Sequence, residues 1–159
     1  MLTHQVLMPP TKRIALIAHD NMKGEMLEWA RFNRDLLAEQ ELFATETTGT
    51  MVAEALDLPV TLFRSGPLGG DQQVGAAIAD GEIDFLIFFW DPLAPHPHDV
   101  DVRALLRIAV VYNIPIACNR SSADFLISSN LMSTRYRHMT IDYPAIASTR
   151  MRRPERRAG

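Results

Sequence analysis

Two loops that carry ionisable residues follow two consecutive strand-like segments of this 159-residue chain. The first loop, 65–73, is rich in glycine and contains Asp71, whereas the second, 91–101, is rich in aspartate, histidine and proline and contains His98. A carboxylate can act as a base, and an imidazole can donate a hydrogen bond to a carbonyl oxygen and transfer protons. In an open parallel sheet, both loops emerge at the carboxyl ends of their strands, where ligands bind. The pattern therefore predicts a small-molecule site built from both loops.

Short apolar runs alternate with helix-like segments, and this order predicts the fold. The five predicted strands lie at 13–18, 42–44, 60–63, 85–90 and 114–118. The predicted helices lie at 22–37, 50–56, 72–80 and 102–112, with a last short helix from Ser121. Five repeats of strand then helix imply a single-domain α/β fold, a doubly wound five-stranded parallel sheet flanked by helices.

The two ends of the chain differ from its centre. The domain is expected to span 11–150, after a loose leader at 1–10 and before a basic tail at 151–159 that is expected to be disordered. The net charge is -3, yet the stretch 133–159 holds seven arginines against two carboxylates. A basic stretch can bind nucleic acid, but we find no aromatic stacking platform or reading motif, so no nucleic-acid partner is expected.

Composition favours a cytoplasmic protein. The only cysteine, Cys118, excludes an internal disulfide and lies in an apolar run, as expected of a reduced core thiol. A hydrophobic content of 47% is enough for one full core. No apolar segment approaches the ~20 residues that a membrane span needs, and the first residues lack the apolar region of a signal peptide. We therefore expect no membrane partner.

Three long motifs in and around the two loops resemble the methylglyoxal synthase family. They read Gly-Pro-Leu-Gly-Gly-Asp-Gln-Gln at 66–73, Phe-Phe-Trp-Asp-Pro-Leu at 88–93 and Pro-His-Asp-x-Asp at 97–101, and the likeness extends over about 13–150. The resemblance implies conversion of dihydroxyacetone phosphate to methylglyoxal and inorganic phosphate through an enediolate. It also implies no metal or organic cofactor, a homohexamer, and cooperative inhibition by inorganic phosphate.

The resemblance assigns the acid–base chemistry to the two loops. Asp71 is the expected catalytic base, although local sequence alone fits a helix cap equally well. Two glycines precede it and are expected to let the backbone approach a small substrate closely. His98 is the expected electrophile, Asp101 is placed to orient its imidazole, and Asp91 adds a second carboxylate nearby. His96 lies outside the matching motif and is given no role.

The expected phosphate site combines short donors with one cation, which suits a dianion. The resemblance assigns phosphate and substrate binding to His19, Asp20, Lys23, Thr45, Thr47, Thr48, Ser65 and Gly66. Local sequence alone favours a plain helix-capping turn for the threonines. Arg150 matches an arginine that reaches a neighbouring subunit's phosphate site in the family, whereas composition alone favours a solvated basic tail.

Two residues depart from the family pattern. Glu46 stands between the threonines where a small residue, typically glycine, is usual, so its carboxylate should point away or weaken anion binding. Val100 stands where a proline is usual and is expected to loosen the loop that holds His98. Neither change removes a reacting group.

Two alternatives compete with the lyase hypothesis. A metal site at His19, Asp20, His98 and Asp101 is disfavoured, because these residues lack a His-x-x-x-His-like spacing. The alternative function is a non-catalytic, allosteric module of the same fold that binds phosphate or another small ligand. Such a module would keep the phosphate loop and lose the acid–base residues, which this chain retains.

Overall fold

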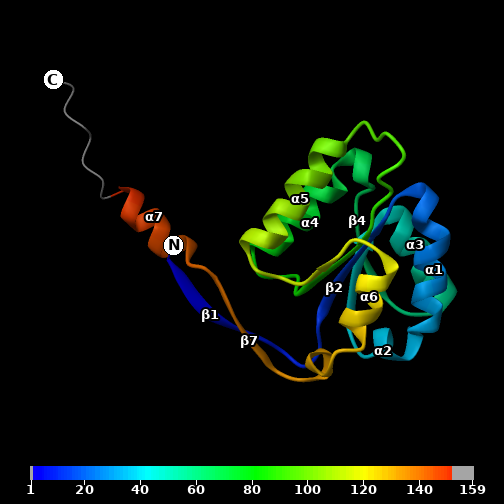
Figure 1. Ribbon diagram of the computed structural model, residues 1–159, viewed down its shortest axis with the longest axis horizontal. Helices are drawn as coiled ribbons and strands as arrows, with labels where there is room; N and C mark the ends of the chain where they lie inside the picture. Colours follow the sequence, from blue (N-terminus) through cyan, green and yellow to red (C-terminus); the bar gives the residue numbers. More distant parts are fainter. Residues whose placement is uncertain (1, 152–159) are drawn as a thin grey trace.

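The computed structural model describes residues 2–151, and its centre is a five-stranded parallel sheet (Figure 1). The strands are β2 (Arg13–Ala18), β3 (Glu41–Thr45), β4 (Val60–Phe63), β5 (Phe85–Phe89) and β6 (Ile116–Ala117). Their order across the sheet is β4-β3-β2-β5-β6. The chain thus builds outward from β2 on one side and then returns to add β5 and β6 on the other. This order confirms the predicted doubly wound α/β fold and creates a switch point between β2 and β5, where ligands bind in such sheets.

The central strands of the sheet, β2 and β5, are buried on both faces. Successive side chains of a strand point to opposite faces, so Leu16 of β2 joins one core cluster while its neighbour Ile17 joins the other. The first cluster is covered by α1 (Lys23–Phe32), α3 (Glu46–Leu56) and α6 (Arg120–Ile127). The second is covered by α4 (Gly70–Ala79) and α5 (Asp99–Val111), which lie side by side (Figure 1).

The first predicted helix is broken into three pieces. They are η1 (Asp20–Met22), α1, and α2 (Arg34–Ala38). The break falls at Asn33, whose side-chain amide donates to the carbonyl of Trp29 at 2.9 Å. Asparagine side chains compete with the backbone for such carbonyls, which favours the end of a helix at this position. The helices α3 and α5 begin earlier than predicted, and α3 follows directly on the carboxyl end of β3, whereas α5 begins after the loop 90–98.

The prediction of a loose leader at 1–10 is wrong. β1 (Thr3–Met8) pairs antiparallel with β7 (Tyr136–Ile141), and the two strands form an arm that extends away from the sheet into α7 (Tyr143–Met151) (Figure 1). The sequence did not predict this pairing, because the two strands lie at opposite ends of the chain and β1, which is mostly exposed, has no buried apolar run. Of the predicted tail, Met151 ends α7, and 152–159 lie outside the described residues.

Lys12 fastens the base of the arm. Its side chain is fully buried, and its Nζ donates to the carbonyls of Pro9 and Thr134, which lie where β1 ends and β7 begins. Burial lowers the pKa of the amine, and a buried amine is costly unless such acceptors satisfy it. The turn η3 (Asn130–Ser133) leads from α6 to this point.

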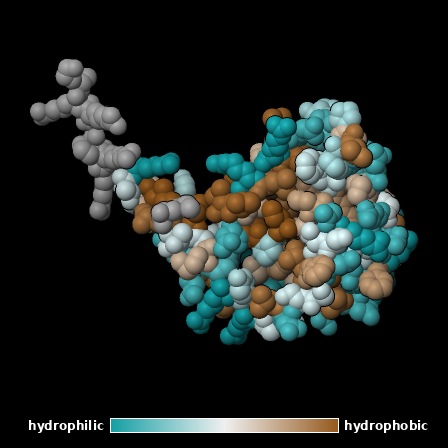
Figure 2. Space-filling view, in the orientation of Figure 1, coloured by the Kyte–Doolittle hydropathy of each residue, from teal (hydrophilic) through white to brown (hydrophobic). Residues whose placement is uncertain are grey.

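Figure 2 shows hydrophobic side chains where the arm faces the domain. Among the described residues, no helix has the length and apolarity to cross a membrane.

Candidate active site

Loops at the carboxyl edge of the sheet surround a cavity of about 310 Å³. His19 follows β2, Thr45 ends β3, Ser65 follows β4, and His98 lies in the loop after β5. Because the strands are parallel, these distant segments all arrive at one edge. The predicted site residues that line the cavity are His19, Asp20, Lys23, Thr45, Thr47, Ser65, Gly66, Asp71 and His98.

Asp71 lies in the first turn of α4 and is 2% exposed. The helix cap is Gly69, so the alternative that Asp71 merely caps this helix is wrong. Both carboxylate oxygens lack a hydrogen-bond partner within residues 2–151. Burial raises the pKa of Asp71, the nearby His98 opposes this rise, and Asp101 adds to it. The carboxylate is therefore a stronger base than an exposed aspartate.

The two glycines before Asp71 serve the chain's own packing. Gly69 has a φ of 98°, which glycine adopts readily. A Cβ on Gly70 would overlap the main-chain carbonyl of Arg64. The expectation that these glycines give a substrate close access is therefore corrected. Gly66 is nearer the reacting groups, because a Cβ there would lie 3.2 Å from Nε2 of His98 and 3.4 Å from a carboxylate oxygen of Asp71.

The side chain of His98 lies close to that of Asp71, and both line the cavity. Its Nε2 lies 3.8 Å from Oδ2 of Asp71, which is too far for a hydrogen bond but within ion-pair range. Its Nδ1 is buried and has no partner among the described residues. Asp101 was expected to orient this imidazole, yet the bond between them is from the Asp101 main-chain N–H to the His98 carbonyl, at 2.9 Å. The Asp101 carboxylate acts on Asp71 instead, by raising its pKa.

The His19 ring is held in one tautomer. The main-chain N–H of Asp91 donates to Nδ1 of His19 at 3.0 Å, so Nδ1 must be an unprotonated acceptor and the proton of the neutral ring is on Nε2. Burial is the main cause that lowers the pKa of His19 to about 4, and His96, His98 and Lys23 add to this effect. His19 is thus a neutral Nε2–H donor near pH 7.

The Asp91 carboxylate does not line the cavity. It accepts hydrogen bonds from the side chain of Asn21 at 2.8 Å and from the main-chain N–H of Leu93 at 3.0 Å. The bond from Asn21 is the main cause that lowers the pKa of Asp91. These contacts give Asp91 a structural place, in which its backbone supports His19 and its side chain ties the loop after β5 to η1.

The other end of the cavity gathers donors for an anion. Nζ of Lys23 donates to Oδ1 of Asp20 at 2.8 Å and to the carbonyl of Ala18 at 2.9 Å. Thr45 caps α3 and Thr47 lies in its first turn, where free main-chain N–H groups and the helix dipole favour negative charge. Together with the segment at Ser65, these groups can bind a phosphate.

Three residues that the sequence singled out lie outside the cavity lining. The hydroxyl of Thr48 is bonded to the main chain of Ala18, at 3.3 Å from its nitrogen and 3.4 Å from its oxygen, and does not line the cavity. Glu46 is exposed and lies outside the cavity lining, as expected of a carboxylate that must not repel an anion. Val100 is exposed within the first turn of α5, so it belongs to a helix and not to a loosened loop.

Known proteins that are similar to this chain point to one family. Residues 25–118 match the model of the MGS-like domain family. The chain is 53% identical to the methylglyoxal synthase of Leptospira interrogans over 139 residues, 87% of this chain and 94% of that protein. It is 56% identical to the methylglyoxal synthase of Coxiella burnetii over 134 residues, 84% of this chain and 94% of that protein. The chain belongs to the methylglyoxal synthase family. The crystal structure of methylglyoxal synthase from Elizabethkingia anophelis superposes with a TM-score of 0.86 at 42% identity, over 98% of this chain and 99% of that one.

Two residues complete the account of this methylglyoxal synthase family member. Arg150 lies on α7 at the far end of the arm, in a hollow with Leu2 and Ile146, and does not reach the cavity of its own chain. His96, which the sequence motif left without a role, lines the cavity and stacks against His19 with ring centroids 3.8 Å apart. The signal was present in Pro95-His96-Pro97-His98, where a second histidine stands two residues before His98 in the same proline-rich loop.

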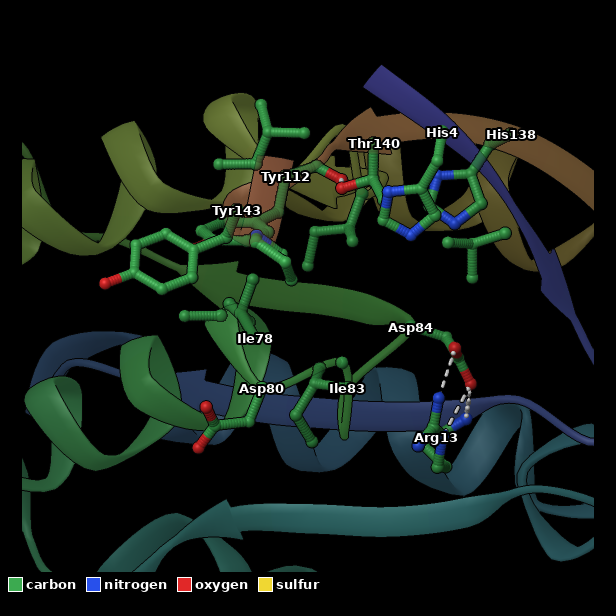
Figure 3. A pocket seen from close by; sticks show the side chains of 16 residues that line it. His4, Arg13, Ile78, Asp80, Ile83, Asp84, Tyr112, His138, Thr140 and Tyr143 are labelled. Carbon is green, nitrogen blue, oxygen red and sulfur yellow. Dashed lines mark hydrogen bonds and ion pairs between the residues drawn. The ribbon is translucent and has the colours of Figure 1, made fainter. Parts of the chain in front are cut away.

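A larger cavity, of about 420 Å³, lies between the arm and the domain (Figure 3). His4 and His138 approach it from the arm, and Arg13 and Asp84 lie at one end of it. The Arg13 and Asp84 side chains bind each other through hydrogen bonds of 2.9 and 3.0 Å. Arg13 and Asp84 are thus already paired with each other. The methylglyoxal synthase motifs, by contrast, contribute Gly66, Asp71 and His98 to the smaller cavity. Within the part of the chain that the structure describes, no three His, Cys, Asp or Glu side chains are grouped so as to bind a metal.

Proposed function

We propose that the chain converts dihydroxyacetone phosphate to methylglyoxal and inorganic phosphate. The observation that carries this proposal is the buried Asp71 carboxylate, which has no partner within residues 2–151 and faces His98 in a cavity with an anion site at its other end. A module that only bound an anion would gain nothing from a desolvated carboxylate next to the ligand, because the carboxylate would repel it. The geometry therefore favours the lyase over the non-catalytic allosteric module.

The first step is proton abstraction. Asp71 takes a proton from the carbon next to the carbonyl, and the C–H electron pair becomes the double bond of an enediolate. His98, close to Asp71, donates a hydrogen bond to the carbonyl oxygen as it gains charge. The Nε2–H of the neutral His19 ring provides a second donor in the same cavity.

The second step releases phosphate. His98 gives a proton to the former carbonyl oxygen and receives one from the neighbouring hydroxyl. The hydroxyl oxygen forms a new C=O bond, the double bond shifts, and the C–O bond to phosphate breaks with its electron pair on the phosphate. The remaining enol takes up a proton at its terminal carbon and loses the proton of its hydroxyl group to give methylglyoxal. Lys23 and the N-terminus of α3 stabilise the departing dianion.

The proposal extends to assembly and regulation. It includes a cytoplasmic homohexamer in which Arg150 of one subunit reaches the phosphate end of a neighbour's cavity. The arm supports this, since it places Arg150 well away from its own domain (Figure 1). A guanidinium can hold a phosphate through two parallel hydrogen bonds. Phosphate would then act both as product and as cooperative inhibitor.

The test is a balance of products. The purified chain is incubated with dihydroxyacetone phosphate, with and without excess EDTA, and methylglyoxal and inorganic phosphate are measured together. We expect equal amounts of both, unchanged by EDTA, because every proposed proton carrier is a side chain. Phosphate release without methylglyoxal, or activity that EDTA abolishes and a divalent ion restores, would contradict the proposal. Asp71→Asn is the matched inactive control.

A further inference from the structure

His96 is held in a rigid segment at the mouth of the candidate active site. It lies between Pro95 and Pro97, whose rings fix their own φ angles, and a residue before a proline is restricted to extended backbone. The main-chain N–H of Asp99 donates to the His96 carbonyl at 3.2 Å and closes a turn, and His96 and His98 both line the cavity from this turn. The sequence thus presents two imidazoles to the site from a loop with little freedom.

The ring of His96 contacts the ring of His19 more closely than any other aromatic neighbour of His19. The two centroids are 3.8 Å apart with an interplanar angle of 30°, whereas Phe88 meets His19 edge-on at 5.1 Å and His98 at 5.9 Å. The hydrogen bond from Asp91 fixes Nδ1 of His19 at the ring's edge. The face of the ring is therefore held by His96, and its edge by the backbone of the loop after β5.

The charged groups around His19 come from three segments. Lys23 belongs to α1, Asp20 to η1, and Asp91, His96 and His98 to the loop after β5. Lys23 and the two histidines oppose a positive charge on His19, while Asp91 favours one. Burial is the largest influence, and it depends on whatever covers the ring face. His96 is the group placed to provide that cover.

We propose that His96 is a positioning residue that holds the imidazole of His19 by ring-to-ring contact, so that Nε2–H of His19 points at the substrate. The inference rests on the proposed function, because it concerns a donor to the enediolate of that reaction. Without the stacked ring, His19 is free to turn about its side-chain bonds and water reaches its face. A donor displaced by about 1 Å can lower a rate by as much as ~10².

The first experiment observes His19 without using activity. His19 is titrated by NMR in the labelled wild-type protein and in His96→Ala, His96→Phe and Leu93→Ala. Leu93 is a control from the same loop, with a side chain that is 93% exposed. In His96→Ala the pKa of His19 should rise from about 4 toward the ordinary 6.5. The rise should be smaller in His96→Phe, which keeps a flat ring, and absent in Leu93→Ala. An unchanged titration in His96→Ala would overturn the proposal.

The second experiment measures kcat/KM for dihydroxyacetone phosphate with the same four proteins. We expect a fall of roughly tenfold in His96→Ala, recovery of most of it in His96→Phe, and wild-type values in Leu93→Ala. Equal losses in the Ala and Phe variants would assign the effect to a nitrogen of His96 and overturn the ring-contact role. Thermal unfolding of each variant separates loss of fold from loss of positioning. If the wild type itself is inactive, the proposed function fails. The NMR titration still shows whether the ring of His96 holds the ring of His19.

Discussion

The two ends of the candidate active site hold their polar groups in different ways. At the reacting end, Asp71, His19 and His98 are largely enclosed, and each has at least one nitrogen or oxygen without a partner among the described residues. At the phosphate end, Lys23 is already bonded to Asp20 and to the main chain, and Thr47 is exposed.

This difference between the two ends predicts different effects on turnover and on ligand affinity. A buried polar atom without a partner costs the folded protein free energy, and such atoms gather where a ligand will pair with them. Groups that are exposed or already paired cost little, and a phosphate has only to compete with their present partners. Substitutions at the reacting end should therefore change turnover, and those at the phosphate end should change affinity.

The largest effect is expected for Asp71→Asn. The amide keeps the shape of the side chain but cannot accept the proton, and loss of a general base typically costs ~10²–10⁴ in rate. Substrate binding should change little. Turnover is measured by methylglyoxal formation, with the exposed Asp99→Asn as the matched control. Turnover within a few-fold of wild type would place the base elsewhere.

His98→Asn should slow the reaction by roughly 10²–10³, as expected when a donor to a developing oxyanion is removed. A second measurement identifies which step of the reaction His98 assists. Exchange of the substrate's carbon-bound proton with solvent, followed by NMR, should slow together with phosphate release. Normal exchange with slow release would instead assign His98 to the elimination step alone.

The desolvated carboxylate should also limit stability. The pKa of Asp71 is raised on folding, so its contribution to the free energy of unfolding is present below the unfolded pKa and is lost as the pH rises through the folded one. At pH 7, Asp71→Asn should unfold at a higher temperature, by about 2–4 °C for each kcal/mol relieved. In wild type, kcat/KM should fall as the pH is lowered. The fall should occur at a higher pH than it would if the base were an ordinary, exposed aspartate. An unchanged unfolding temperature across pH 4–8 would mean that a bound ion or water satisfies the carboxylate.

Arg150→Ala tests whether this arginine binds phosphate in the cavity of a neighbouring subunit. Phosphate affinity should fall roughly tenfold, as for the loss of a hydrogen bond to a charged group, and the sigmoidal response to substrate under phosphate should weaken. Truncation after Met151 is the control and should change neither. Saturation curves at several phosphate concentrations decide the matter. Identical Hill coefficients in a cooperative wild type and in Arg150→Ala would exclude the coupling role.

Glu46→Gly should have the smallest effect. The carboxylate is exposed in the first turn of α3, so its removal should tighten phosphate binding by less than about fivefold, the scale of an exposed charge at a helix terminus. Glu46→Gln removes the charge without adding backbone freedom and should tighten binding similarly. Phosphate affinity measured by calorimetry checks both variants. Weaker binding in both would show that the carboxylate supports the local structure.

The sheet and most of the cavity lining follow from local patterns in the sequence. Each buried strand is a continuous apolar run that is followed at once by polar residues, and in a parallel sheet such residues meet at one edge whatever the details of packing. That is why His19, Thr45, Ser65 and His98 could be predicted to lie together. The family motifs added which of these groups react, a role that spacing alone left open.

Which polar groups remain free to meet a ligand depends on contacts between distant segments of the folded chain. Hydrogen bonds between distant segments tie Asp91 to Asn21 and Thr48 to Ala18, and so remove two predicted side chains from the cavity. The same kind of contact brings His96 onto His19. The arm formed by β1 and β7 belongs to this class too, because its partners come from opposite ends of the chain. Local patterns specify which elements form and which way side chains alternate, whereas the choice among competing long-range partners is made only when the whole chain packs.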